Sequence, residues 1–356
     1  MKILFLTKYG AMGASSRVRS IQFRTKLEEK TNASIHISSL FGNRYIKALY
    51  GKSNLKYIFA IIGYIKRFLF LFFCLGKYDL IIVEKELFPY LPSCFEKLIS
   101  LYHKPYVLDY DDAIFHNYTK YDSGIMRFLL RNKLTELIRN AELVHCGNPY
   151  IESFMLSTGA KRTKIVPTVI DLEKYISQSQ SFDTHSKFIV GWIGSPSTTK
   201  YLASIMGVLE DLASKYDIAF VTIGASEITS DKLEIIQYPW TEESEARLLS
   251  QISVGIMPLP DEKWERGKCG YKLIQYMALK KPVIASPVGV NSFLVTDDVG
   301  YLCNSDEEWA TALETLINDA DKQRLMGASG FSLVCEKYNT DKISDELART
   351  INDYKK

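Results

Sequence analysis

The sequence predicts an α/β protein of two Rossmann-like domains, each built on a doubly wound parallel sheet. Three observations support this prediction. Short apolar runs alternate with amphipathic, helix-length stretches along the whole chain, which is the pattern of βαβ units. A length of 356 residues is too great for one ordinary core and suits two domains. Unusual polar motifs follow the apolar runs, where doubly wound sheets bind their ligands.

The apolar runs set the expected strands. In the first half they cover residues 2–7, 33–38, 79–83, 106–109 and 142–146, and in the second half residues 187–193, 217–222, 254–258, 282–285 and 299–302. The segment 165–171 and the polar run 177–186 mark the boundary and linker. We therefore expect an N-terminal domain over residues 1–168 and a C-terminal domain over residues 169–339. An amphipathic helix within residues 340–356 is expected to pack back on the first domain.

Composition indicates a cytoplasmic globular protein. Apolar residues make up 47% and charged residues 24% of the chain, which are ordinary values for a globular protein. The six cysteines are scattered, without a C-x-x-C pair or metal-ligand spacing, as in a reducing compartment. The N-terminus enters an expected strand without a cleavable signal pattern.

The charge is divided unevenly along the chain. Residues 1–170 hold 25 Lys and Arg against 13 Asp and Glu, a net charge of +12. Residues 171–356 hold 19 against 28, a net charge of −9. This asymmetry predicts that the first domain faces an anionic surface or ligand. Nucleic acid is not the expected partner, because the basic residues show no interleaving with aromatic residues and no known motif.

The run 57–75 has the length of a membrane span, but Lys66 and Arg67 stand at its centre, where charge is costly. A strand follows within a few residues, so we expect a crossover helix packed on the sheet that does not span a membrane. Its Phe-rich composition, with basic residues just before it, also fits a helix dipping into an anionic bilayer surface. We therefore expect peripheral association with the inner face of the membrane. The preceding basic residues are Arg44, Lys47, Lys52 and Lys56.

The expected strands of the first half are followed by candidate binding residues. Gly10 and Gly13 belong to a small-residue loop that opens a helix, an arrangement that binds anions, and Arg17 and Arg19 follow them. Further along come Glu86, the run Asp109–Asp112 and Asn148. Three carboxylates in four residues need a cation, a proton or a donor network. They are candidate catalytic groups or metal ligands, and the alternative is a helix cap with solvated acids.

The second half carries two further glycine-containing segments. The stretch 190–199 supplies glycine, serine and threonine ahead of an expected helix, which suits a phosphate group. In the stretch 264–278 basic and glycine residues precede an amphipathic helix, and the buried strand 282–285 follows.

This second stretch resembles the region of GT-B glycosyltransferases similar to family 4, the group 1 glycosyltransferases, that reads E-G-F-G-x-x-x-x-E-A-M-A-x-G-x-P-V-I-A-S. Residues 275–278 fall on E-A-M-A, residues 281–286 on the stretch after it, and Gly270 on its second glycine. Residues 165–171, 194–202 and 254–260 are similar to other family segments. The resemblance implies two Rossmann-like domains facing a central cleft, with the donor bound by the C-terminal domain.

Two departures from the family pattern stand out. The family's two glutamates, eight positions apart, are here Gly267 and Gln275. The second acid binds ribose hydroxyls, which Gln275 can also do, whereas the first touches the sugar. The arginine and lysine that bind the diphosphate become Ser195 and Lys200, and Lys268 and Lys272 are expected to replace the lost charge. Asp111 falls where many relatives carry a histidine.

The resemblance implies a retaining, metal-independent transfer of a sugar from a UDP- or GDP-linked donor, with no cofactor. The expected acceptor is lipid-linked or a cell-surface glycan of capsule, O-antigen or exopolysaccharide synthesis. The alternatives are a nucleotide-sugar epimerase, a non-catalytic partner subunit and a metal-dependent D-x-D transferase. The expected site comprises catalytic Asp111 and Asp112; donor-binding Gly10, Gly13, Gly194, Ser195, Thr199, Lys200, Lys268, Gly270, Lys272 and Gln275; and acceptor-binding Arg17, Arg19, Glu86 and Asn148.

Overall fold

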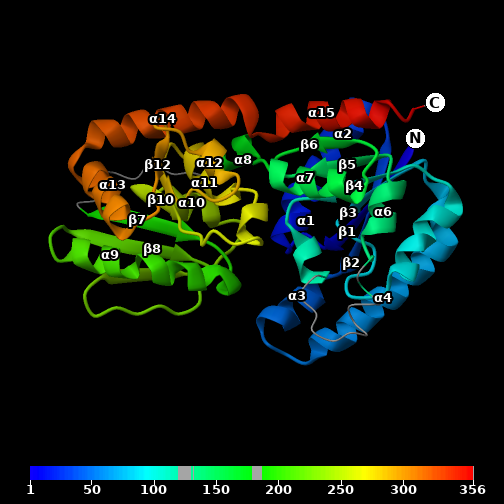
Figure 1. The fold of residues 1–356 in the computed structure, drawn as a ribbon, viewed down its shortest axis with the longest axis horizontal. Helices are drawn as coiled ribbons and strands as arrows, with labels where there is room; N and C mark the ends of the chain where they lie inside the picture. Colours follow the sequence, from blue (N-terminus) through cyan, green and yellow to red (C-terminus); the bar gives the residue numbers. More distant parts are fainter. Residues whose placement is uncertain (119–129, 131, 179–186, 356) are drawn as a thin grey trace. The chain divides into compact units, whose positions relative to one another are not determined.

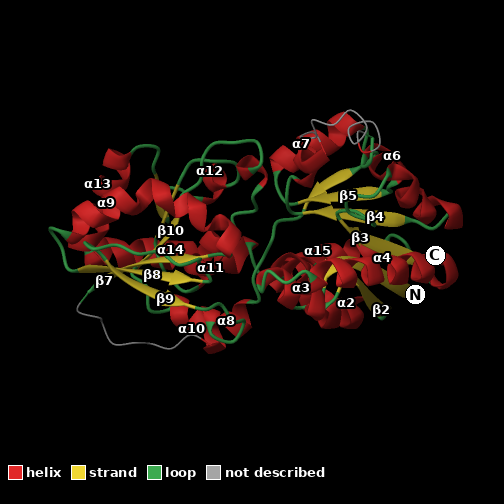
Figure 2. Ribbon diagram, turned by 90° about the horizontal axis from the view of Figure 1, so that it is seen from below, coloured by secondary structure: helices red, strands yellow, loops and turns green. Residues whose placement is uncertain are grey.

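The structure is a computed structural model that describes residues 1–118, 130, 132–178 and 187–355. The chain divides into two compact units, each with helices around a central sheet (Figures 1 and 2). Unit 1 comprises Met1–Thr168, Gly267–Cys269 and Thr340–Lys356. Unit 2 comprises Val169–Arg266 and Gly270–Asn339. The expected linker residues 179–186 lie outside the described part of the chain.

Unit 1 is built on a six-stranded sheet in the order β2-β1-β3-β4-β5-β6. All five strand pairs are parallel. The central strands β3 and β4 are buried along their whole length, as expected of apolar runs covered on both faces. The strands are β1 (Lys2–Tyr9), β2 (Ser34–Phe41), β3 (Leu80–Glu84), β4 (Tyr106–Tyr110), β5 (Leu143–Cys146) and β6 (Thr163–Ile165).

Helix α7 of unit 1 (Pro149–Thr158) starts and stops at ordinary signals. The side chain of Asn148 caps α7 by accepting the amide hydrogen of Ile151, Pro149 opens the helix, and Gly159 ends it at φ 102°. The other helices are α1 (Ala14–Arg19), α2 (Arg24–Thr31), α3 (Asn43–Tyr50), α4 (Leu55–Cys74), α6 (Thr135–Asn140) and α15 (Thr340–Asn352), with 3₁₀ turns η1 (Ile21–Phe23), η2 (Leu75–Lys77), η3 (Ser93–Tyr102) and η4 (Ile114–Tyr118).

Helix α4 connects β2 to β3, as expected, but it packs on the unit through a narrow stripe. Gly63, Arg67 and Leu71 are its buried residues. Ile61 and Phe73 expose 59% and 69% of their surface, so the helix turns a broad apolar face outward. By length and composition, α4 together with η2 is the one described helix able to cross a membrane.

Helix α15 packs on α2 and completes unit 1. Lys26 pairs with Asp341 and Lys30 with Asp345, both at 2.5 Å. On its inner face Leu347 and Ile351 are buried. Since exposed ion pairs contribute little, the apolar residues account for most of the attachment.

Unit 2 has a second six-stranded parallel sheet, in the order β12-β11-β10-β7-β8-β9. Helix α11 lies close to β10, because the ring of Tyr276 occupies the space where a Cβ on Gly255 would stand. The strands are β7 (Phe188–Ile193), β8 (Ile218–Ile223), β9 (Glu234–Tyr238), β10 (Val254–Met257), β11 (Val283–Ala285) and β12 (Gly300–Leu302). The helices are α8 (Leu172–Gln178), α9 (Ala203–Ala213), α10 (Glu245–Leu249), α11 (Tyr271–Ala278), α12 (Asn291–Leu294), α13 (Asp306–Asn318) and α14 (Ala320–Lys337), with 3₁₀ turns η5 (Pro196–Leu202) and η6 (Glu265–Gly267). The last residue of η6, Gly267, belongs to unit 1.

The predicted fold class is confirmed, and every expected strand forms. Two strands were not expected. Strand β6 has three residues and none of them is buried. Strand β9 lies at the edge of its sheet, and none of its residues is fully buried either. Neither strand carries the apolar run by which a buried strand is recognised.

Candidate functional site

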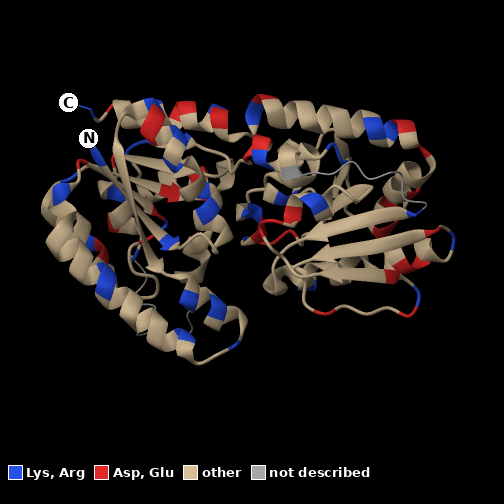
Figure 3. Ribbon diagram, turned by 180° about the vertical axis from the view of Figure 1, so that it is seen from behind, with Lys and Arg blue, Asp and Glu red and all other residues tan. Residues whose placement is uncertain are grey.

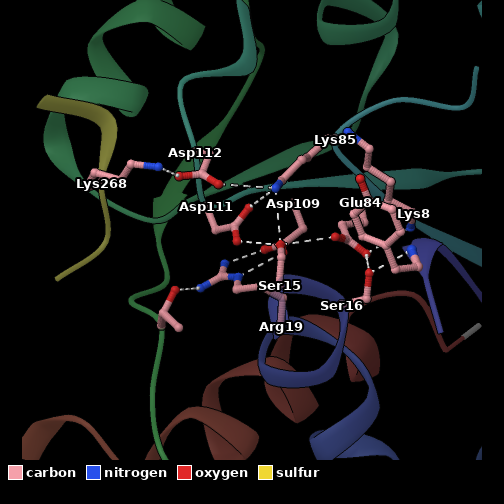
Figure 4. A network of polar contacts seen from close by, with 12 residues as sticks. Lys8, Ser15, Ser16, Arg19, Glu84, Lys85, Asp109, Asp111, Asp112 and Lys268 are labelled. Carbon is pink, nitrogen blue, oxygen red and sulfur yellow. Dashed lines mark hydrogen bonds and ion pairs between the residues drawn. The ribbon is translucent and has the colours of Figure 1, made fainter. Parts of the chain in front are cut away.

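The carboxyl edge of the sheet in unit 1 gathers charged residues from loops far apart in the sequence. Strands β1, β3 and β4 are adjacent and parallel, so the residues that follow them meet at one edge. Figure 4 shows the resulting network, which also includes Lys268 of the short segment Gly267–Cys269. Its labelled members are Lys8, Ser15, Ser16, Arg19, Glu84, Lys85, Asp109, Asp111, Asp112 and Lys268.

Arg19 and Asp109 form a two-point ion pair at the base of this network. The guanidinium Nη2 lies 2.5 Å from Asp109 Oδ1, and Nε lies 2.9 Å from Oδ2. The guanidinium also donates to the carbonyl oxygen of Val166 at 2.8 Å. Burial raises the pKa of Asp109, and Arg19 opposes that shift, so we assign the pair as ionised. Both side chains are almost fully buried, so loss of Arg19 would leave Asp109 at the end of β4 as an unpaired buried charge.

Lys85 is the centre of the network, and sequence reasoning missed it as a site residue. Its Nζ lies 2.7 Å from Asp111 Oδ1 and 3.5 Å from Asp112 Oδ2, and it donates to Ser15 Oγ at 3.1 Å. Its backbone has φ 64°, a left-handed conformation that non-glycine residues seldom adopt. Burial lowers the pKa of Lys85, but the nearby carboxylates outweigh burial and raise it above its ordinary value. The side chain is therefore a buried cation.

Glu84 anchors the start of α1 to the end of β3. Its Oε2 accepts hydrogen bonds from Ser16 Oγ at 2.6 Å and from the amide of Lys8 at 3.0 Å. Its Oε1 accepts from Ser15 Oγ at 3.1 Å. Burial raises the pKa of Glu84, against the lowering effect of Lys85. Glu84 thus fixes the two serines that open α1.

The two expected catalytic carboxylates, Asp111 and Asp112, have different environments. Asp111 is 4% exposed, and its Oδ2 accepts from Ser15 Oγ at 2.6 Å. Burial raises the pKa of Asp111, but Lys85 and Arg19 together lower it to about 2. Asp112 is only half-buried, with its Oδ1 at 3.3 Å from the ammonium of Lys268. Asp111 is therefore a fixed anion, and Asp112 is the more accessible of the two.

The residues expected to bind an acceptor lie at or near this edge. Arg17 is 9% exposed. Glu86 is buried and accepts a hydrogen bond from the hydroxyl of Tyr118 at 2.6 Å. Asn148, besides capping α7, donates to the carbonyl oxygen of Lys268 at 3.0 Å.

Gly10 and Gly13, expected to bind the donor, shape the loop after β1. The amide of Gly10 donates to the carbonyl oxygen of Phe41 at 3.1 Å. Gly13 precedes the first residue of α1, and a Cβ there would stand 2.3 Å from the Cβ of Tyr9. A side chain at position 13 is thus excluded unless the loop moves. Both glycines lie in unit 1, together with Lys268.

Unit 2 brings Gly194 and Lys272 together at the carboxyl edge of β7. The Nζ of Lys272 lies 4.1 Å from the ring centroid of Trp192, a cation–π contact. It would stand 2.6 Å from a Cβ on Gly194. Gly270, at φ 67°, precedes helix α11, on which Lys272 lies in the first turn. This edge combines a cation, a glycine and a helix N-terminus, which suits a diphosphate.

The other expected donor residues lie in or beside η5. Ser195 precedes that turn, and its Oγ lies 2.9 Å from Ser197 Oγ. Thr199 accepts the amide hydrogen of Ser226 at 2.8 Å. The ammonium of Lys200 lies 5.1 Å from the ring centroid of Tyr201.

Gln275 is buried at 3% exposure in a polar network within unit 2. Its Nε2 donates to the hydroxyl of Tyr175, which in turn donates to Glu245 Oε1 at 2.8 Å. Trp240 donates to the other oxygen of that carboxylate at 2.7 Å. In this structure the amide of Gln275 positions Tyr175.

Among the described residues, no group of three or more His, Cys, Asp or Glu side chains is arranged to hold a metal ion. In unit 1 the carboxylates face the cations of Arg19, Lys85 and Lys268 instead. Protein ammonium and guanidinium groups thus supply the positive charge at this edge.

Comparison with known proteins confirms the predicted resemblance in unit 2. Residues 187–319 match the family model described as "Glycosyl transferases group 1". This region contains β7 to β12 and both Gly194 and Lys272. No curated protein matches the chain.

Solved structures with the same fold cover nearly the whole chain. HepE of Anabaena, in complex with UDP, has a TM-score of 0.68 at 16% identity, with 99% of this chain and 100% of HepE covered. Sucrose-phosphate synthase of Thermosynechococcus elongatus has a TM-score of 0.68 at 15% identity, with 99% and 98% covered. A glycosyltransferase of Rickettsia africae has a TM-score of 0.71 at 12% identity, again with 99% and 98% covered. The fold is therefore the GT-B fold of glycosyltransferases.

Proposed function

We propose that the protein is a glycosyltransferase that moves a sugar from a UDP- or GDP-linked donor to an acceptor hydroxyl. The carrying observation is the placement of Lys272 beside Gly194 at the carboxyl edge of β7, within the region that matches the group 1 glycosyltransferases. An ammonium group and a helix N-terminus stabilise the negative charge of a diphosphate. The complexes of HepE with UDP and with UDP-glucose support a UDP-sugar as the donor.

The proposed transfer retains the configuration of the sugar and needs no metal. Its transition state resembles an oxocarbenium ion with a diphosphate leaving group, so most of the catalysis is charge stabilisation and positioning. Lys200 and Lys272 in unit 2 neutralise the leaving diphosphate. The fixed anion Asp111 and the more accessible Asp112 orient the acceptor or stabilise the sugar.

The proposed acceptor is lipid-linked or part of a cell-surface glycan, and α4 supports this choice. The helix exposes a broad apolar face, and a bilayer surface can bury such a face. Figure 3 shows Lys and Arg bands on α3 and α4, and neither helix contains an acidic residue. Basic residues near an anionic leaflet contribute about 1 kcal/mol each. Peripheral binding to the inner leaflet would bring unit 1 to lipid-linked acceptors.

Arg67 supports a helix that lies on the membrane rather than through it. Its guanidinium donates to the backbone carbonyl oxygens of Thr7 and Ser38, at 2.8 and 2.9 Å. These carbonyls belong to β1 and β2, so α4 is tied to the sheet at its middle. Pulling Arg67 into the bilayer would break both bonds and leave its charge in hydrocarbon without those partners.

Titration of the full chain with UDP-glucose, UDP-N-acetylglucosamine and GDP-mannose tests the donor. Binding of one of them raises the melting temperature of the native state. Transfer or slow hydrolysis of that sugar, unchanged in a strong chelator and with the product anomer matching the donor, supports the retaining, metal-independent reaction. Binding of none of these compounds contradicts the proposed function.

Vesicle sedimentation tests the membrane surface. Binding to anionic vesicles is expected to weaken in high salt without vanishing, because apolar contacts are not screened. Ile61→Ser with Phe73→Ser should abolish it, while the same change at the exposed Leu325 of unit 2 should not. Equal binding to neutral vesicles, or binding to neither kind, contradicts this model.

A further inference from the structure

Unit 2 contains a buried carboxylate with one oxygen left without a partner among the described residues. Glu265, the first residue of η6, is 3% exposed. Its Oε1 accepts a hydrogen bond from the hydroxyl of Tyr201. Its Oε2 is buried and accepts none. Burying an acceptor of this kind without a donor is costly, so native proteins seldom leave one unpaired without a functional reason.

No cation of the described chain is placed to neutralise this carboxylate. The adjacent Arg266 instead forms a two-point pair with Asp261, at 2.7 and 3.0 Å. This buried oxygen is therefore an acceptor that a hydrogen-bond donor from outside the described chain could satisfy. An anionic phosphate would be repelled by the carboxylate, whereas a neutral hydroxyl group meets the requirement.

Glu265 lies at the edge where the proposed donor site is formed. It belongs to the loop between β10 and α11, and its partner Tyr201 belongs to η5, which follows β7. Strands β7 and β10 are adjacent and parallel, so both segments leave the sheet at the same edge as Gly194. The carboxylate thus belongs to the loop between β10 and α11 and accepts its hydrogen bond from η5, and both segments lie at that edge.

A second buried acceptor on this edge also has no hydrogen-bond partner among the described residues. Asn291, fully buried in α12, donates through Nδ2 to the carbonyl oxygen of Ser286 at 3.1 Å. Its Oδ1 accepts no hydrogen bond among the described residues and lies 3.8 Å from the position of a Cβ on Gly270. Both unmatched groups in these two loops are acceptors, which suits a ligand rich in hydroxyl groups.

We propose that Glu265 binds the transferred sugar, with Oε2 accepting a hydrogen bond from one of its hydroxyl groups; this rests on the proposed function. The position where the family pattern has its first glutamate is Gly267, where a Cβ would lie 2.3 Å from the Cβ of Ala113. No acidic side chain fits there without movement of the loop. Glu265, two residues earlier, supplies the carboxylate that Gly267 lacks.

The test compares the affinities of full-length Glu265→Gln for a nucleoside diphosphate and for its sugar conjugate. The pairs are UDP with UDP-glucose, UDP with UDP-N-acetylglucosamine, and GDP with GDP-mannose, measured by calorimetry. Since the substitution replaces a charged acceptor by an amide, the sugar conjugate that binds best should bind about tenfold more weakly, with the free diphosphate unchanged. Glu262→Gln, an exposed neighbour in the same loop, should change neither affinity.

A structural role for Glu265 gives a different result. It would lower the melting temperature and weaken both ligands of a pair equally, or leave both unchanged, and either outcome overturns the proposal. If Glu265→Gln does not fold, the ratio of the affinities for the sugar conjugate and the free diphosphate is measured on Glu265→Asp instead. This substitution shortens the side chain but keeps its charge. Failure of the wild-type chain to bind any of these compounds contradicts the proposed function itself, whereas binding with an unchanged ratio contradicts only the role of Glu265.

Discussion

The carboxyl edges of the two sheets differ in how their polar groups are paired. In unit 1 the charges are matched internally: Arg19 pairs with Asp109, and Lys85 with Asp111. In unit 2 the edge includes glycines, one lysine in the first turn of α11 and two buried acceptor atoms without partners among the described residues. A matched network holds its own geometry without a ligand, whereas an unmatched edge is completed by one. We infer from this comparison that unit 1 is preorganised, and that under the proposed function the donor completes the edge of unit 2.

The largest expected effect comes from breaking the matched network of unit 1. Arg19→Met leaves the buried carboxylate of Asp109 without its partner and should lower the free energy of unfolding of unit 1 by about 3–5 kcal/mol. Urea denaturation, followed by a probe in unit 1, measures it. Arg24→Met, which removes only an exposed pair with Glu28, should cost less than about 0.5 kcal/mol. Equal effects of the two changes would refute internal matching.

Next in size is the loss of turnover in Asp111→Asn. The substitution removes a fixed anion from unit 1 while the donor residues of unit 2 stay intact, so turnover should fall about 100-fold with unchanged nucleotide affinity. Steady-state kinetics and calorimetry on the same preparation separate the two quantities. A variant with near-normal turnover would return the carboxylate to a purely structural role.

A smaller effect is expected from the edge of unit 2. Lys272→Ala should weaken binding of the nucleoside diphosphate about tenfold, since one charge-assisted hydrogen bond is lost, and should leave stability almost unchanged. The exposed Lys263 of the same loop offers a matched control. If Lys272→Ala destabilises the fold as strongly as Arg19→Met, the contrast between the two edges disappears.

The smallest expected effect is on the pH dependence of the stability of unit 1. Burial lowers the pKa of His145 on β5 from its ordinary 6.5 to about 3, so the folded unit keeps the imidazole neutral. The unfolded chain takes up the proton first as pH falls below 6.5, and stability is lost from there down to about pH 3. Between pH 7 and pH 5.5 this costs about 1 kcal/mol.

His145→Asn should remove this part of the pH dependence, while His103→Asn at an exposed position should keep it. Melting curves at the two pH values measure the difference. An unchanged slope in His145→Asn would show that another group carries the acid sensitivity of unit 1.

The sheets could be predicted from the sequence because apolar runs directly report burial. The edge residues could be predicted as a region for the same reason, since the end of each run marks the edge. The pairing of these residues could not be predicted. Lys85 and Asp111 are 26 positions apart, so no local pattern connects them. In the sequence, an isolated lysine after a strand is indistinguishable from a solvent-exposed one. Likewise the pattern match marks Gln275, but only packing reveals its bond to Tyr175.

Helix α4 is a second element that the sequence predicts only in part. Its length and its helical state follow from composition, and so does its position between two strands. The small buried fraction of α4 could not be predicted from its composition, because an apolar helix packed on a sheet and one facing a bilayer have similar sequences. The packed side is marked by Gly63, where a Cβ would stand 2.5 Å from the carbonyl oxygen of Leu40, together with Arg67 and Leu71.

The attachment of α15 has a consequence for how the chain is made. Unit 1 begins at the first strand, yet its core includes Leu347 and Ile351 near the far end of the sequence. During synthesis on the ribosome, the segment 169–339 of unit 2 emerges before those residues do. Unit 1 is thus the first to be translated but the last to complete its core. Until α15 has been synthesised, the apolar surface that it covers in unit 1 is accessible to chaperones.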